Sequence, residues 1–193
     1  MTEQHLEGYE WPRPSGIEPF NHQKETAHFL ATRSKAFCFN EQGTGKTASV
    51  IWATDYLMNV GAVKRVLIVC PLSIMHSAWQ QDLFKFAIHR MVDMAYGSAS
   101  KRKQIISGVA EYVIINFDGV EIVREEIARG GFDLIVIDEA SAYKNASTTR
   151  WKVLRYLLQH IKGLWMLTGT PAAQSPVDAY GLAKLVNPRS TPP

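Results

Sequence analysis

Short runs of apolar residues recur along this chain of 193 residues, separated by longer amphipathic or charged segments. A helical pattern covers residues 21–32, another helix is expected from the Gly-rich segment to about residue 59, and a last helix over 176–186. The apolar runs, each of strand length, are 35–40, 66–70, 92–96, 112–116, 133–138 and 164–169. Strands joined by crossover-length segments predict an α/β fold, a doubly wound, mostly parallel sheet with helices on both faces.

The two ends of the chain differ from this pattern. Residues 1–19 contain three prolines and two glycines, which block helix continuation and sheet pairing. We therefore expect an extended leader that lies over the core. Residues 189–193 include two further prolines and are expected to begin a linker. Residues 20–188 remain as one domain, a length at which a single core can bury most of its apolar surface.

Composition adds a few limits. The chain is 46% hydrophobic and 20% charged, which favours a globular fold, and its formal charge of +3 tolerates a polyanionic partner without demonstrating one. No apolar run approaches the roughly 18 residues of a membrane span, and the first residues lack a signal-peptide pattern. We expect a protein that is cytoplasmic, or nuclear in a eukaryote, and not secreted.

Cysteine and histidine are each accounted for without a metal. Cys38 and Cys70 lie in apolar, strand-like runs, so reduced core thiols are expected rather than a disulfide or metal site. The six histidines show no zinc-ligand spacing with cysteine or acidic residues. No transition metal is assigned.

The segment NEQGTGKT, residues 40–47, lies between the first strand and the next helix. Gly43 and Gly45 allow the backbone to wrap around phosphate oxygens, while the helix directs free N–H groups at the same anion. Lys46 can reach the β and γ phosphates, and the Thr47 hydroxyl can bind Mg²⁺. The sequence thus predicts a site for a magnesium nucleoside triphosphate, although Asn40 replaces the first Gly of the generic pattern. A strand-to-helix turn carrying GKT by chance is the alternative.

Two adjacent carboxylates, Asp138 and Glu139, lie at the end of a strongly apolar predicted strand. Burial there is costly unless a cation or a reaction needs them. In phosphate-loop NTPases an Asp at this place holds Mg²⁺, often through water, and a neighbouring carboxylate orients or deprotonates the attacking water. We assign those roles to Asp138 and Glu139 respectively. The alternative is an acidic pair that caps the next helix.

Six stretches of the chain, taken in order, closely resemble a known family. They are FNHQKETAHFL, EQGTGKT, VLIVCPLSIMHSAW, VIINFD, VIDEASAYKNASTTRWKVLR and LTGTPAAQSPVDAYGLAKLVNP. Together they resemble the first, N-terminal RecA-like motor domain of Swi/Snf-type helicase-like ATPases, which belong to the DEAD/DEAH-like superfamily two. The resemblance covers about residues 20–188, and DEA-x-x-x-K-N followed by LTGTP and N-P is its most specific part. It implies a RecA-like P-loop NTPase fold.

The resemblance also implies roles for single residues. Gln23 would hydrogen-bond the adenine base, and Phe20 would stack nearby. Ser141 stands where many relatives have His, which puts the coupling of ATP to nucleic acid in question. The implied nucleotide-binding residues are Phe20, Gln23, Gln42, Gly43, Thr44, Gly45, Lys46 and Thr47. The implied catalytic residues are Lys46, Asp138 and Glu139, with Thr47 and Asp138 on Mg²⁺. The implied coupling or nucleic-acid residues are Pro71, Leu72, Ser73, Asn116, Phe117, Thr168, Gly169 and Thr170.

The function that the resemblance implies is the ATP-binding lobe of a DNA-dependent ATPase that moves along double-stranded DNA without reading its sequence. Its cofactors would be ATP and Mg²⁺, and its partners DNA and a second RecA-like domain of the same protein, with no membrane. Because that second domain supplies arginines to the γ phosphate, the chain alone is expected to bind nucleotide but hydrolyse it poorly.

Two other functions stay open. A non-helicase P-loop NTPase, such as a kinase, would keep the Gly-rich loop but would not explain LTGTP or Gln23. A short, non-catalytic module that binds DNA or a partner protein is the second.

Two features are expected to be structural. Trp79, spaced with Phe84, is expected to pack in the core rather than stack on bases. The basic run 101–103 is expected to be solvated, with contact to a phosphate backbone as the alternative.

Overall fold

The computed structural model of the chain describes residues 6–39, 45–169 and 176–187. Within them, one six-stranded sheet has the order β1-β6-β5-β2-β4-β3, and every neighbouring pair is parallel. The strands are β1 (Lys35–Phe39), β2 (Val66–Cys70), β3 (Val92–Ala95), β4 (Tyr112–Asn116), β5 (Leu134–Ile137) and β6 (Gly163–Thr168). Each predicted run forms a strand, and the predicted doubly wound α/β sheet is confirmed.

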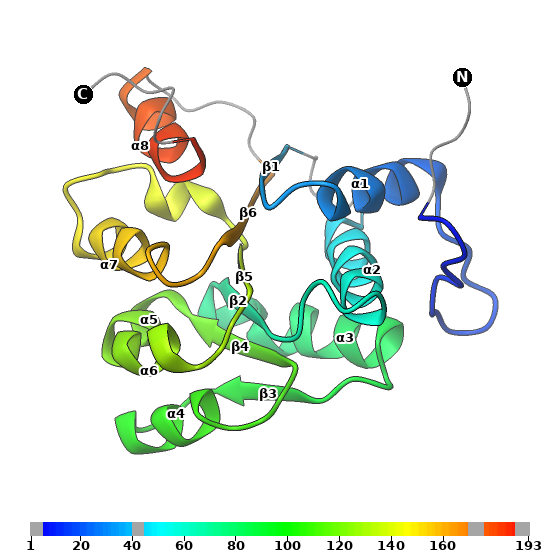
Figure 1. Cartoon of the computed structure of the whole chain (residues 1–193), viewed down its shortest axis with the longest axis horizontal. Coiled ribbons are helices and arrows are strands. Elements are labelled where there is room, and N and C mark those ends of the chain that lie inside the picture. The colour runs from blue at the N-terminus through cyan, green and yellow to red at the C-terminus, as the bar shows by residue number, and fades with distance from the viewer. Residues whose placement is uncertain (1–5, 40–44, 170–175, 188–193) are drawn as a thin grey trace.

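Helices cover both faces of the sheet, as Figure 1 shows. One face carries α1 (Asn21–Ala31), α2 (Lys46–Asn59) and α3 (Gln81–Phe86). The other carries α4 (Ala99–Ile106), α5 (Phe117–Ile122), α6 (Arg124–Arg129) and α7 (Thr149–Leu157), while α8 (Pro176–Val186) packs beside β1. Shorter turns are the 3-10 turns η1 (Leu72–Ile74) and η3 (Ala140–Tyr143) and the π-helical turn η2 (Met75–Gln80). In the part of the chain that the structure describes, no helix has the length and apolar character to cross a membrane.

The sheet separates two hydrophobic clusters, and β2 contributes to both. Val66, Ile68 and Cys70 pack among the residues of α1, α2 and α3. Leu67 and Val69, which point the opposite way, pack among those of α4 to α7. Burial on both faces explains why the strands are continuous apolar runs rather than alternating ones. Both cysteine thiols are free and buried, in keeping with core positions.

The leader packs on the outer side of α2 (Figure 1). Trp11 is buried, and its ring meets that of Trp52 edge to face at 5.6 Å. The Trp52 indole Nε1–H donates to the carbonyl of Pro12 at 2.8 Å. Tyr9 donates its hydroxyl to Asp55 Oδ2 at 2.6 Å. Residues 6–19 are therefore tied to α2 by both apolar and polar contacts.

Asp55, in the middle of α2, is a fully buried carboxylate that the sequence did not single out. Its Oδ1 accepts a hydrogen bond from Arg90 Nε at 2.7 Å and lies 2.8 Å from His89 Nε2. Arg90 also pairs with Glu111 at 2.8 Å. This network connects the leader, α2 and the segment that enters β3.

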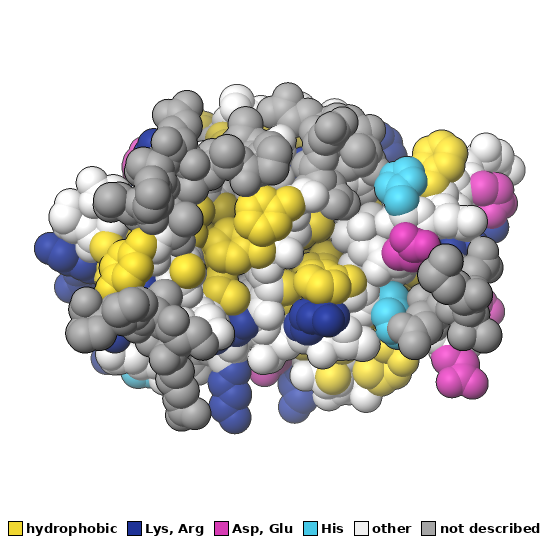
Figure 2. Space-filling model, turned by 90° about the horizontal axis from the view of Figure 1, so that it is seen from above, with side chains coloured by type: hydrophobic (Ala, Val, Ile, Leu, Met, Phe, Trp, Pro, Cys, Tyr) yellow, Lys and Arg dark blue, Asp and Glu magenta, His cyan; other side chains and the backbone are white. Residues whose placement is uncertain are grey.

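β1 is an edge strand of the sheet and carries exposed aromatic surface. The rings of Phe37 and Phe39 stack at 5.3 Å, and Phe39 is 56% exposed. Seen from above, from the side on which β1 and α8 lie, hydrophobic side chains gather in the middle of the molecular surface (Figure 2).

Candidate functional site

The predicted site residues follow the carboxyl ends of five neighbouring strands, in the order β1, β6, β5, β2 and β4. Thr168 is the last residue of β6 and pairs with Phe39, which ends β1 before the Gly-rich segment. At the other end, Cys70 of β2 pairs with Asn116 of β4. Along this edge β1 precedes the Gly-rich segment, β6 ends at Thr168, β5 precedes Asp138 and Glu139, and β2 and β4 lead into the other predicted nucleic-acid residues.

The start of α2 shows why glycine is needed there. Gly45 precedes the helix with φ 74° and ψ 32°, a left-handed conformation that favours glycine. A Cβ atom at Gly45 would overlap the side-chain nitrogen Nε2 of Gln23. The predicted base-sensing residue thus lies against the predicted phosphate-binding segment. Three further predicted residues, Gln42, Gly43 and Thr44, lie outside the described residues.

Gln23 is held in place by the first turn of α1. Its side chain is 8% exposed, and Oε1 accepts a hydrogen bond from the Phe20 backbone N–H at 3.0 Å. The Phe20 ring is 66% exposed and stacks on His22 at 5.5 Å. An amide held beside an exposed flat ring is suited to a planar base, because the ring offers stacking area and the amide offers directed hydrogen bonds.

Lys46 and Asp138, which are far apart in sequence, both belong to the carboxyl edge of the sheet, Lys46 after β1 and Asp138 after β5. Lys46 and Thr47 are the first two residues of α2, and both are half-buried. Burial raises the pKa of Asp138, while the hydrogen bond from Trp79, the backbone N–H of Glu139 and the charge of Lys46 act to lower it. The Lys46 ammonium is therefore within electrostatic reach of the Asp138 carboxylate.

The backbone and two N–H donors fix the acidic pair. The Asp138 N–H donates to the Val69 carbonyl at 2.8 Å and so continues the pairing of β5 with β2. Asp138 Oδ1 accepts from the Glu139 N–H at 3.0 Å, and Oδ2 accepts from Trp79 Nε1–H at 2.9 Å. Glu139 has φ 59° and ψ 61°, which is unusual for a residue with a side chain and costs about 1–3 kcal/mol. Such backbone strain clusters at functional sites.

The side-chain oxygens of Asp138 and Thr47 are suited to binding Mg²⁺. Each Asp138 oxygen accepts one N–H and keeps a further lone pair, and a carboxylate oxygen with a threonine hydroxyl is a hard donor set. Mg²⁺ typically takes one or two carboxylates together with phosphate and water oxygens. Among the described residues, no three or more His, Cys, Asp or Glu side chains cluster as a metal cage.

The loop after β2 is accessible. Leu72 is 53% exposed and Ser73 is also exposed, both in η1, while Pro71 before them is half-buried. The Ile74 N–H donates to the Pro71 carbonyl at 3.2 Å, which closes the turn. This loop presents the Leu72 and Ser73 side chains to solvent.

Asn116, at the end of β4, is buried and points inward. It is 8% exposed, and its Oδ1 accepts from Arg102 at 2.9 Å. Arg102 is itself 7% exposed and also donates to the carbonyls of Ala95 and Gly97 at 2.7 and 3.0 Å. The expectation that the basic run 101–103 is solvated is therefore wrong for Arg102. The pattern of charged residues cannot show that the carbonyls of Ala95, at the end of β3, and Gly97, just after it, accept hydrogen bonds from a buried arginine.

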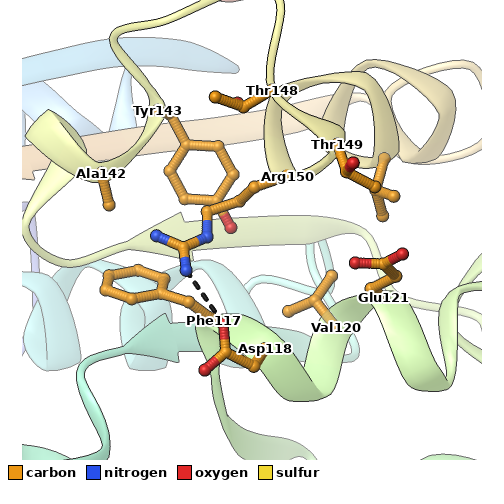
Figure 3. A pocket seen from close by; sticks show the side chains of 10 residues that line it. Phe117, Asp118, Val120, Glu121, Ala142, Tyr143, Thr148, Thr149 and Arg150 are labelled. Atoms are coloured by element: carbon orange, nitrogen blue, oxygen red, sulfur yellow. Dashed lines mark hydrogen bonds and ion pairs between the residues drawn. The ribbon is translucent and has the colours of Figure 1, made fainter.

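Phe117 lines a pocket of about 380 Å³ between α5 and the segment from η3 to α7. Figure 3 shows Arg150 reaching over this pocket to Asp118, at an ion-pair distance of 2.9 Å. The Arg150 guanidinium lies 4.8 Å from the centre of the Phe117 ring, whose edge meets Tyr143 at 5.8 Å. The pocket places an arginine next to the predicted contact residue Phe117, and the sequence did not single out Arg150.

A family model for the SNF2-related domain matches residues 22–191 of the chain. The chain belongs to the SNF2-related domain family. This SNF2-related domain is 28% identical over 175 residues to the uncharacterized ATP-dependent helicase YqhH of Bacillus subtilis, covering 88% of this chain and 29% of YqhH. It is 27% identical over 162 residues to the chromatin-remodeling ATPase INO80 of Neosartorya fischeri, covering 77% of this chain and 9% of INO80.

The fold agrees with that family. The SWI2/SNF2 ATPase core of Sulfolobus solfataricus, solved in complex with double-stranded DNA, superimposes with a TM-score of 0.79 at 23% identity. The match covers 96% of this chain and 38% of that one. The predicted RecA-like fold and the predicted resemblance to the first Swi/Snf motor domain are thus confirmed. The SNF2-related domain described here spans less than a third of YqhH and a smaller share of INO80.

Three predicted positions complete the edge of the SNF2-related domain. Thr168 is 5% exposed, and Gly169 after it is half-buried. Thr170 lies outside the described residues. Ser141, at the position where the resemblance implies His in many relatives, is exposed in η3.

Trp79 has a role at the site that the sequence did not reveal. It is fully buried, as expected, but Phe84 is 69% exposed and does not share its core position. Trp79 donates to Asp138, which follows β5, whereas Trp79 itself follows β2. The two residues come together because β2 and β5 are neighbouring strands. Sheet order is the signal that could have found this contact.

Proposed function

We propose that this SNF2-related domain is the ATP-binding lobe of a DNA-dependent ATPase that couples hydrolysis to movement along double-stranded DNA. The observation that carries the proposal is that Lys46, at the start of the helix after β1, and Asp138, at the end of β5, belong to the same carboxyl edge of the parallel sheet. Two comparisons support it. YqhH is named an ATP-dependent helicase, and the Sulfolobus core was solved with double-stranded DNA.

ATP would bind across the starts of α1 and α2. Gln23 and Phe20 would bind the adenine base, since one offers hydrogen bonds and the other an exposed ring. Lys46 and the start of α2 would bind the phosphates, because the helix dipole favours negative charge there. The residues from Gln42 to Thr44 would complete this cradle.

Thr47 and Asp138 would hold Mg²⁺ through their oxygen atoms. When bound, Mg²⁺ neutralises charge on the transferring phosphate oxygens. Glu139, half-buried beside Asp138, would orient the attacking water and accept its proton. The left-handed backbone of Glu139 directs its side chain differently from a regular strand continuation.

DNA would run along the other half of the edge. The exposed loop of Leu72 and Ser73 and the pocket with Phe117 and Arg150 offer backbone N–H groups, a hydroxyl and a guanidinium. Such groups contact phosphates without reading base sequence. Thr168, Gly169 and Thr170 follow β6, the strand between β1 and β5, and would couple the ATP site to the DNA-binding loops. Because the Asn116 side chain is turned inward to Arg102, we propose that it stabilises the end of β4 instead of contacting DNA.

A second RecA-like domain would complete the ATP site. The large share of YqhH and INO80 outside the match supports this, as those proteins contain much more chain. We propose residues 20–188 as the motor lobe and 189–193 as the start of the linker. Losing an arginine finger lowers turnover by about 10³–10⁵ in comparable systems. The chain alone would therefore bind ATP weakly and hydrolyse it poorly.

Nucleotide titrations test the binding site. Binding of a fluorescent ATP analogue with Mg²⁺ is measured for wild type, Lys46→Ala and Lys152→Ala, the last removing an exposed lysine of α7. Lys46→Ala should weaken binding at least about tenfold, because the main phosphate cation is lost, while Lys152→Ala should not. Equal binding by wild type and Lys46→Ala would refute the ATP site.

ATP turnover tests the motor. It is compared with and without double-stranded DNA for this chain and for a polypeptide extended by the residues that follow Pro193 in the gene. DNA-stimulated turnover only in the longer polypeptide supports the half-motor. Brisk turnover by this chain without DNA contradicts it. If the gene encodes no continuation and the chain binds DNA without turnover, the regulatory module is the better description.

A further inference from the structure

Trp79 joins the exposed loop after β2 to the carboxylate of Asp138. Its ring is fully buried, and its Nε1–H donates to Asp138 Oδ2 at 2.9 Å. Any backbone carbonyl could satisfy a buried indole N–H, as the Arg33 carbonyl does for Trp165 at 2.9 Å. At Trp79 the acceptor is instead the carboxylate proposed to hold Mg²⁺. The hydrogen bond therefore fixes one of the two oxygens that a metal ion would use.

The segment that carries Trp79 is irregular. The exposed 3-10 turn η1 leads directly into η2, a π-helical turn whose buried residues are Met75 and Trp79. A π-helical turn is wider than an α-helical one, is rare, and frequently lies at functional sites. Returning it to α-helical pairing shifts the register of the side chains that follow. The same six-residue turn thus has the exposed loop at its start and the donor to Asp138 near its end.

Packing and a hydrogen bond connect the exposed loop at the start of η2 to Trp79 near its end. Met75 is 2% exposed and anchors the start of η2, and the turn also packs on β3 and β4. The Ser77 hydroxyl donates to the Ser73 carbonyl at 3.0 Å and ties η1 to η2. A displacement of the loop is therefore passed to Trp79 rather than absorbed by a flexible joint.

We propose that Trp79 is a positioning residue through which DNA phosphates at the loop of residues 71–74 change the orientation of Asp138 and hence the binding of Mg²⁺ with nucleotide. This inference rests on the proposed function. It supplies a connection that does not depend on position 141, where an exposed serine stands and the resemblance implies His in many relatives. The connection runs along η1 and η2 within the lobe itself.

The first test measures the Mg²⁺ concentration that half-saturates nucleotide binding, with and without a short double-stranded DNA. Trp79→Phe keeps an aromatic ring but removes the N–H, and Trp165→Phe removes a buried N–H bonded to a backbone carbonyl elsewhere. Trp79→Phe should raise the half-saturating Mg²⁺ about tenfold, in line with the loss of a partner that orients a metal ligand. Nucleotide binding without Mg²⁺ should stay unchanged, and DNA should no longer alter the Mg²⁺ requirement. Trp165→Phe should change neither.

A second measurement needs no substitution at Trp79. The chain contains five tryptophans, so 5-fluorotryptophan labelling gives five fluorine NMR signals, assigned through Phe variants of the other four. Mg²⁺ with nucleotide, and DNA added separately, should each shift the Trp79 signal and leave that of Trp165 in place. A Trp79 signal that does not move with saturating DNA overturns the proposal, as does a Trp79→Phe variant that matches Trp165→Phe. If wild type binds neither nucleotide nor DNA, the proposed function itself fails.

Discussion

The side-chain amide of Gln23 fills the space that a Cβ atom on Gly45 would need, and it does so directly in front of α2. One glycine thus satisfies two separate demands. Its φ of 74° disfavours side chains, and its missing Cβ lets the proposed base-sensing residue approach the proposed phosphate-binding segment.

Gly45→Ala should therefore lose both stability and nucleotide affinity. The matched control is Gly61→Ala, because Gly61 has φ 73° but nothing within 4 Å of its missing Cβ. Gly61→Ala should lower the free energy of unfolding by about 1–2 kcal/mol, the cost of the left-handed backbone. Gly45→Ala should lose more than this and also bind nucleotide more weakly. Denaturant unfolding and nucleotide titration measure both, and equal losses in the two variants would disprove a role for the Gln23 contact.

Glu139→Gln should separate binding from chemistry. The substitution keeps the size of the side chain but removes the base, so nucleotide affinity should stay at the wild-type value. Residual hydrolysis should fall about 10²–10⁴-fold, the usual contribution of a general base. Single-turnover hydrolysis under saturating protein measures the rate, with the exposed Glu7→Gln as the control. A Glu139→Gln variant that hydrolyses ATP like wild type would remove Glu139 from the proposed mechanism.

Asp55→Ala should strongly destabilise the fold. The carboxylate is fully buried and bonded to Arg90 and Tyr9, so its removal leaves buried donors without an acceptor. The expected loss is about 3–5 kcal/mol in the free energy of unfolding. Asp82→Ala removes a carboxylate from the partly exposed pair with Lys85 and should cost less than about 1 kcal/mol. Chemical denaturation measures the loss of unfolding free energy in both variants. A loss under about 1 kcal/mol for Asp55→Ala would contradict the prediction.

Cys70 should make stability depend on alkaline pH. Burial, with a further contribution from Asp138, raises the pKa of its thiol from 9.0 to about 12. A raised pKa in the folded state means that the stabilising contribution is complete below pH 9 and declines as pH rises from 9 towards 12. The difference in unfolding free energy between wild type and Cys70→Ala should therefore narrow above pH 9.

Native Cys70 should also resist iodoacetamide at mildly alkaline pH, because the reactive thiolate is suppressed. Rapid alkylation of the folded protein would show that the thiol is accessible.

Much of the fold was predictable because the strands are buried on both faces. Val66–Cys70 is a continuous apolar run with every residue buried, and such runs stand out in a sequence. The helix over 176–186 was predicted with the bounds that the structure gives. The π-helical turn η2 was not predicted, since its wider hydrogen bonding has no distinct pattern of apolar residues.

The site was predictable only where one short segment carries the chemistry. Gly45 and Lys46 belong to one motif, and Asp138 and Glu139 to another. Contacts between segments were missed, because the hydrogen bond from Trp79 to Asp138 depends on β2 lying beside β5. The inward turn of Arg102 depends in the same way on the ends of β3 and β4. Residues 40–44, at the centre of the phosphate motif, stay predictions.

The docking of the leader on α2 has a practical consequence for anyone who expresses this domain. The family match begins at residue 22, whereas the folded unit already includes Leu6, Tyr9 and Trp11. A clone trimmed to the family boundary would uncover the indole of Trp52 and remove the Tyr9 hydroxyl from Asp55. The shortened protein would expose aromatic surface on α2 and would have a less stable α2, so it would be prone to aggregate. A polypeptide expressed for study should therefore include the leader.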